Sequence, residues 1–165
     1  MTSSISLNLS TTAIIQEIYA ASALRCLQNI NNGKRPPLLT RDQEPALRLL
    51  VKDSFAHTIL RLLPHIVSCN LNNEDSDGTH ITTTEDVILS AEIYIPTGFP
   101  TSATGTLRHA VEHAIAMDAM HLCYMGHNDS LSQRHATLAD EAIKNIERLL
   151  STTSAENAKI AINWL

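Results

Sequence analysis

The chain of 165 residues is long enough for one domain that buries most of its unfolded surface, so no disulfide or metal is needed to hold it together. Hydrophobic residues make up 44% and charged residues 18%, which excludes a disordered chain, and the aromatic content of 4% leaves aliphatic side chains to fill a largely helical core. The net charge of -5, without a run of lysine or arginine, argues against a groove that binds nucleic acid on its own.

The first predicted element is a helix over residues 11–29, which Ser10 or Thr11 can cap. Its apolar residues recur at intervals of three and four, which indicates one buried stripe. They are Ile14, Ile15, Ile18, Ala21, Leu24 and Leu27. Residues 31–37 contain a glycine and two prolines and are expected to end the helix and form a linker.

A second helix is expected to begin after Thr40, which forms a capping-box pattern with Gln43, or after Asp42 as an alternative cap. Its continuous apolar stripe consists of Leu47, Leu50, Val51, Phe55, Ile59, Leu62, Leu63 and Ile66. Pro64 removes one backbone hydrogen bond from that stripe, so the helix either stops there or kinks and continues to about Ser68.

A polar loop over residues 70–84 precedes a segment in which apolar and polar residues alternate, over residues 87–95. A period of two predicts a strand with one apolar face, ended by Pro96, Gly98 and Pro100. The only partner we expect for it in the same chain is residues 80–84, and an isolated hairpin of this kind is marginal unless a helix or another chain covers it.

A third helix is predicted from Thr104 or Thr106 to about Met125, and a fourth from Asp129 or Ser130 to about Leu150, with a break at residues 126–128. The fold is therefore expected to be mainly α, a bundle of about four helices with a short β strand or hairpin between helices two and three. Residues 1–150 form a single domain with the β insertion near 79–96, and residues 151–165 form an apolar tail that docks on another surface.

The three cysteines are far apart and odd in number, which fits neither a disulfide framework nor a zinc ribbon and favours a reducing compartment. The Ser/Thr-rich segment over residues 1–12 lacks the basic and apolar regions of a signal peptide. The sequence contains no run of about 18 apolar residues, so it gives no indication of a membrane span.

Three histidines of the third helix are candidate metal ligands: His109, His113 and His121. The first two are four residues apart and face one side, which is a valid geometry for two ligands. His121 is two turns further along, so a single ion does not easily bind all three. Glu112 does not follow the first histidine directly, which excludes the metalloprotease order H-E-x-x-H. We therefore expect polar or interfacial histidines and no cofactor.

Asp118 falls on the apolar side of the third helix, where a bare carboxylate costs several kcal/mol to bury. We expect Arg25, Arg61 or a basic residue of a partner to pair with it. A structural ion pair is the simpler interpretation, and a catalytic carboxylate is the alternative.

Residues 73–78 resemble the first half of a calcium-binding loop, but Thr84 stands where the bidentate glutamate is required. An acidic turn is therefore the preferred interpretation. The sequence contains neither a G-x-S-x-G nucleophile motif nor a phosphate loop, which favours a binding or structural role.

Three segments occur in an order that resembles a known group of proteins: residues 38–43 opening a helix, residues 93–96 closing a strand, and residues 107–114 opening a helix pair. This plan looks like that of small helical proteins from prophage structural regions of gut bacteria, and of the head-to-tail connector, or neck adaptor, proteins of tailed phages. The similarity spans roughly residues 11–150. It implies a ring-forming oligomer with no catalytic residues.

The function we predict is accordingly that of a structural virion assembly protein, a connector that binds like copies and the portal or tail components. It is expected in the virion after assembly in the reducing bacterial cytoplasm, without membrane contact or direct nucleic-acid readout. The residues expected to contact partners are Val87, Leu89, Ile93, Ile95, Ile162, Trp164 and Leu165. The alternatives are a helical metal-dependent enzyme using His109 and His113, and a bacterial interaction module without catalysis.

Overall fold

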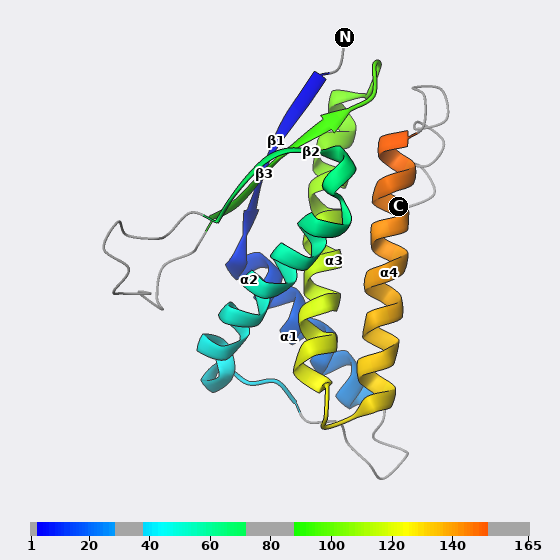
Figure 1. Cartoon of the computed structure of the whole chain (residues 1–165). Helices are drawn as coiled ribbons and strands as arrows, with labels where there is room; N and C mark the ends of the chain where they lie inside the picture. The colour runs from blue at the N-terminus through cyan, green and yellow to red at the C-terminus, as the bar shows by residue number, and fades with distance from the viewer. Residues whose placement is uncertain (1–2, 29–37, 72–87, 152–165) are drawn as a thin grey trace, which may run out of the picture.

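A computed structural model of the whole chain describes residues 3–28, 38–71 and 88–151 (Figure 1). It contains four long helices, α1 (Thr11–Gln28), α2 (Glu44–Arg61), α3 (Thr104–Tyr124) and α4 (Asp129–Ser151). Three strands, β1 (Ser3–Ser10), β2 (Ile66–Leu71) and β3 (Ile88–Ile95), form a small antiparallel sheet. The prediction of a mainly helical fold with about four helices is thus confirmed. The β element differs from the short strand or hairpin expected between the second and third helices, because β1 precedes α1 and pairs with β3. Among the described helices, none is long and apolar enough to cross a membrane.

Helix α3 is the centre of the bundle, since it contacts α1, α2, α4 and β1. It buries residues on most of its circumference, among them Leu107, Val111, Ile115 and Met120. Several of its other buried positions are alanines, which allow neighbouring helices to approach closely. The apolar third helix predicted from the sequence is therefore the main core element.

The ends of the helices follow local rules that the sequence predicts. The Ser10 hydroxyl accepts the backbone N–H of Ala13 at the start of α1 (3.1 Å), and the Gln43 side chain accepts the N–H of Thr40 (3.1 Å) before α2. Gly126, with φ of 78°, adopts the left-handed conformation directly after α3. The expected break at residues 126–128 is confirmed.

Helix α2 ends at Arg61, and Pro64 lies in a 3-10 turn over Leu63–His65. The first of the two expected outcomes, a stop at Pro64, is therefore correct. The continuation to Ser68 is wrong, because Ile66 begins strand β2 instead. The predicted buried stripe also needs correction at Leu63, which is 59% exposed, and at Leu24 and Leu27 near the end of α1.

The sheet has the order β1-β3-β2, with β3 in the middle. Ser3 to Ser10 pair with Ile95 to Ile88 without interruption, and β2 pairs with the other side of β3. Both sides of β3 are thus occupied, so the expectation that only residues 80–84 pair with it is wrong; those residues lie outside the described part of the chain. The inner face carries Leu7, Leu9, Leu89, Ala91 and Ile93 into the core.

Candidate functional site

The three histidines of α3 do not form a common site. The His113 Nδ1 donates to the Glu17 Oε1 of α1 (2.5 Å), whereas the His121 Nδ1 donates to the backbone carbonyl of Ser132 in α4 (3.1 Å). His109 is exposed. In the described ranges, no group of three His, Cys, Asp or Glu side chains is placed to hold a metal ion. The geometry thus gives each histidine a separate environment.

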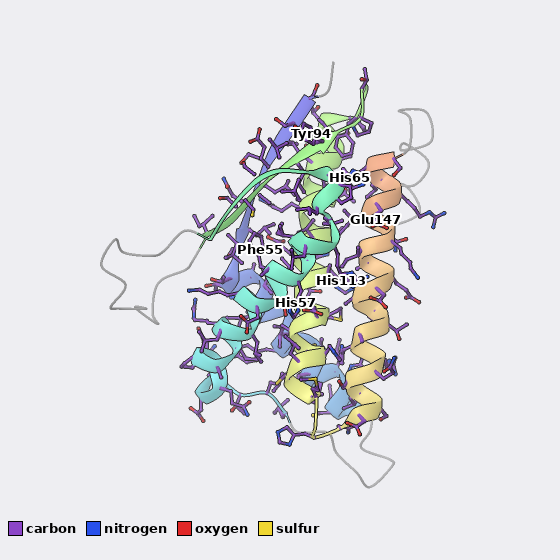
Figure 2. All side chains as sticks on the ribbon, viewed as in Figure 1. Phe55, His57, His65, Tyr94, His113 and Glu147 are labelled. Atoms are coloured by element: carbon purple, nitrogen blue, oxygen red, sulfur yellow. The ribbon has the colours of Figure 1, made fainter. Side chains whose placement is uncertain are left out.

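Asp118 finds a hydrogen-bonding partner on α2. Its Oδ2 lies 3.1 Å from the Nδ1 of His57, and its side chain is 18% exposed compared with 53% for His57. Figure 2 shows His57 on α2 close to α3. The expected partners Arg25 and Arg61 were wrong choices, since Arg61 contacts Asp140 of α4 at 2.7 Å. The carboxylate belongs to a helix–helix contact.

A second polar cluster lies between the start of α1 and α3. Glu112 accepts a hydrogen bond from the backbone of Ser10, and it lies near Glu17, whose carboxylate binds His113. Burial raises the pKa of the Glu112 carboxyl, although Arg108, the Ser10 hydrogen bond and His109 oppose that shift. The Glu112 side chain thus ties the junction of β1 and α1 to the central helix.

His135 is the buried polar residue that sequence reasoning missed. Its side chain is 0% exposed, and neither ring nitrogen has a hydrogen-bond partner in the described structure. The ring stacks on Tyr124 of α3 with centroids 5.7 Å apart. Burial, together with the nearby charges of Arg25, Arg134 and His121, lowers the pKa of His135 to about 4. The imidazole is therefore neutral and acts as a packing group of the α3–α4 contact.

The outer face of the sheet is polar. The Ser4 hydroxyl (2.6 Å) and the Ser68 hydroxyl (3.2 Å) both donate to the carboxylate of Glu92 in the central strand. Glu92 also lines a hollow of about 240 Å³ together with Ser6, Ser68, Cys69, Ser90 and Ala91. This face therefore carries negative charge at its centre.

The outward backbone side of residues Ser3–Leu9, here called the β1 edge, pairs with no strand in the described part of the chain. The whole strand β1, Ser3–Ser10, is eight residues long and contains no charged residue, no proline and no bulge. Such edges commonly accept another strand. The sequence contained a signal for β1, because Ile5, Leu7 and Leu9 alternate with polar residues, but the Ser/Thr-rich composition obscured it.

Ten large apolar side chains are exposed among the described residues, and seven of them fall into two groups, whereas Leu49 of α2 and Ile88 and Tyr94 of β3 belong to neither. The turn-end group contains Leu24, Leu27, Leu38 and Met125, from the end of α1, the chain before α2 and the turn after α3. The α2-end group contains Leu60, Leu63 and Val67, from the end of α2 and the start of β2. Figure 1 shows these segments at opposite ends of the bundle. The molecule therefore presents apolar surface at both ends of its long axis.

The predicted partner contacts divide into buried residues and residues outside the described ranges. Leu89 and Ile93 are 0% exposed in the chain's own core, so the expectation that they contact a partner needs correction, and Ile95 packs against the same core. Val87, Ile162, Trp164 and Leu165 lie outside the described residues, as do residues 73–78 of the calcium-like loop. The accessible surfaces are instead the β1 edge and the two apolar groups.

Comparison with protein-family models, with curated proteins and with solved structures finds no match to this chain, so its surfaces and chemistry are the basis for any functional conclusion.

Proposed function

We propose that this chain is a structural virion assembly protein, a ring-forming head-to-tail connector that contacts portal or tail components. The observation that carries the proposal is the exposure of apolar side chains at both ends of the bundle, with Leu27 at 64% and Leu60 at 66%. A protein that joins two others needs two separated contact surfaces. The turn-end group and the α2-end group supply one at each end.

The character of these groups supports a role in assembly. Leu60 at the end of α2, Leu63 in the turn that follows and Val67 in β2 are all exposed within eight residues of the chain. Single exposed leucines are ordinary, but several close together along one segment are typical of a partner contact. The prophage resemblance and the long β1 edge point in the same direction, since both favour a protein that contacts further chains.

The polar clusters support the same proposal. The Asp118–His57 and Glu17–His113 contacts each join α3 to a neighbouring helix. His135 is fully buried and stacked, so no substrate reaches it. Each of these chemically notable side chains therefore has a structural role, and the accessible features suit the binding of proteins.

Native mass spectrometry and negative-stain electron microscopy of the full chain, alone and with a portal protein from the same prophage, test the proposal. We expect closed rings, either alone or on the portal. The variant Leu63→Glu should weaken portal or tail binding, and Leu27→Glu should weaken binding at the opposite end. A compact monomer that binds neither component and retains a stoichiometric metal ion after dialysis would support the enzyme alternative and contradict the connector.

A further inference from the structure

The two edges of the sheet differ in how well they are protected from pairing. The β2 edge follows Pro64 and is interrupted by a register shift between Ile66 and Ser68. Prolines and bulges are devices that prevent strand addition. The β1 edge has an uninterrupted register and no charged residue, so it is the better acceptor for an added strand.

The same chain contains a sequence suited to that edge. In residues 159–165, which lie outside the described structure, Ile160, Ile162 and Trp164 alternate with Lys159, Ala161 and Asn163, and the terminal Leu165 follows on the side of the second set. A period of two is typical of a strand with one apolar and one polar face. Beside β1, its apolar face would continue the row of Ile5, Leu7 and Leu9, and its polar face would continue the row of serines and Asn8.

Charge favours the same orientation. The outer face of the sheet carries Glu92, which accepts hydrogen bonds from Ser4 and Ser68. Lys159 alternates with the apolar residues of the segment, so in a strand added beside β1 it would lie on the side of the negatively charged outer face. With the opposite face of the segment turned outward, isoleucines would lie over this carboxylate.

The geometry points to a head-to-tail contact in which residues 159–165 of one copy add as a strand to the β1 edge of a second copy. Every copy then carries one donor segment and one acceptor edge. A contact between two different surfaces of identical chains generates rings when the rotation closes. The inference rests on the proposed assembly function and names the contact that joins the copies.

Three full-length proteins test this contact: the natural chain, Ile162→Asp, and the matched control Asn163→Asp. Both variants gain one negative charge at adjacent positions, but only the first places it on the apolar face of the segment. Sedimentation should show concentration-dependent association of the natural chain and of Asn163→Asp. Ile162→Asp should raise the dissociation constant on the order of tenfold or more, because an isoleucine no longer becomes buried.

Two readouts locate the contact. Trp164 is the only tryptophan, so a blue shift of its emission on association reports its burial. Hydrogen exchange should show protection of residues 3–9 in the associated natural chain and its loss in Ile162→Asp. Any of three results would overturn the inference. The two variants could associate equally strongly, the Trp164 emission could be independent of concentration, or the exchange of residues 3–9 could be unchanged by association. The connector proposal is tested separately by ring formation and portal binding, so the two can fail independently.

Discussion

The Asp118 carboxylate lies on α3, the central packing helix, and its Oδ2 is 3.1 Å from the Nδ1 of His57 in α2. The carboxylate is the more buried partner of the two. The exposed His57 side chain therefore supplies a hydrogen-bond partner for the largely buried Asp118 carboxylate.

Removal of His57 should cost more stability than removal of a comparable surface partner. His57→Ala should lower the free energy of unfolding by about 1 kcal/mol, because Asp118 loses its partner in a mostly buried position. Arg61→Ala disrupts the more exposed pair with Asp140, at 40% and 53% exposure, and should cost at most about 0.5 kcal/mol. Urea denaturation of both variants measures the difference, and equal losses would contradict it.

His135 should make the protein sensitive to acid. Its pKa of about 4 in the folded chain is below the ordinary value of 6.5, so the unfolded chain binds its proton first as the pH falls. Stability is unaffected above pH 6.5 and is lost between about pH 6.5 and 4, by an amount on the order of 3 kcal/mol. Denaturant unfolding at a series of pH values measures this loss.

The variant His135→Leu should remove that part of the pH dependence. It should be no less stable than the natural chain at pH 7, because the removal of two buried nitrogens without partners offsets the loss of the stacking on Tyr124. His127→Gln changes an exposed histidine of the α3–α4 turn and should keep the natural pH dependence. Persistence of the acid loss in His135→Leu would refute the assignment to His135.

Leu62 and Leu63 are adjacent residues with opposite expected effects. Leu62 is 0% exposed and Leu63 is 59% exposed. Leu62→Ala should lower the free energy of unfolding by about 2–5 kcal/mol through a core cavity, whereas Leu63→Ala should change it by less than about 0.5 kcal/mol. Thermal and urea unfolding report these effects, and a large loss at Leu63 would show that this side chain belongs to the core.

Two glycines should respond oppositely to alanine. Gly126 has a φ of 78° and no atom within 4 Å of an added Cβ, so Gly126→Ala should cost about 1 kcal/mol from the backbone alone. Gly105 lies in the first turn of α3 with equally open space, so Gly105→Ala should raise stability by about 0.5–1 kcal/mol. Differential scanning calorimetry compares them, and the same sign at both sites would be inconsistent with the two backbone conformations.

The helices were predictable because their periodicity and end signals are local. Ser10, Gln43 and Gly126 mark boundaries through contacts with residues a few positions away. The pairing of β1 with β3 was not predictable in this way, since Ser10 and Ile88 are far apart in the chain. Strand β2 is six residues long and begins two residues after Pro64, at the end of an apolar stripe that also suits a helix, so periodicity alone does not identify it.

The polar residues follow the same division. The sequence identified Asp118 as a carboxylate on an apolar face, but its partner depends on how α2 packs against α3. His135 had a readable signal, since it lies with Ser132, Ala139 and Ala142 on the buried stripe of α4. A histidine in such a stripe is easily taken for a surface residue, and only the packing against Tyr124 shows its burial.

The order β1-β3-β2 also sets a schedule for folding during synthesis. The first strand made is completed by residue 10, while its partner begins at residue 88. At the usual rate of about 5–20 residues per second, the ribosome needs on the order of 4–16 seconds to make the intervening residues. During that interval β1 lacks β3, its neighbour in the described sheet, so nascent chains on one messenger are most prone to aberrant strand pairing before β3 emerges.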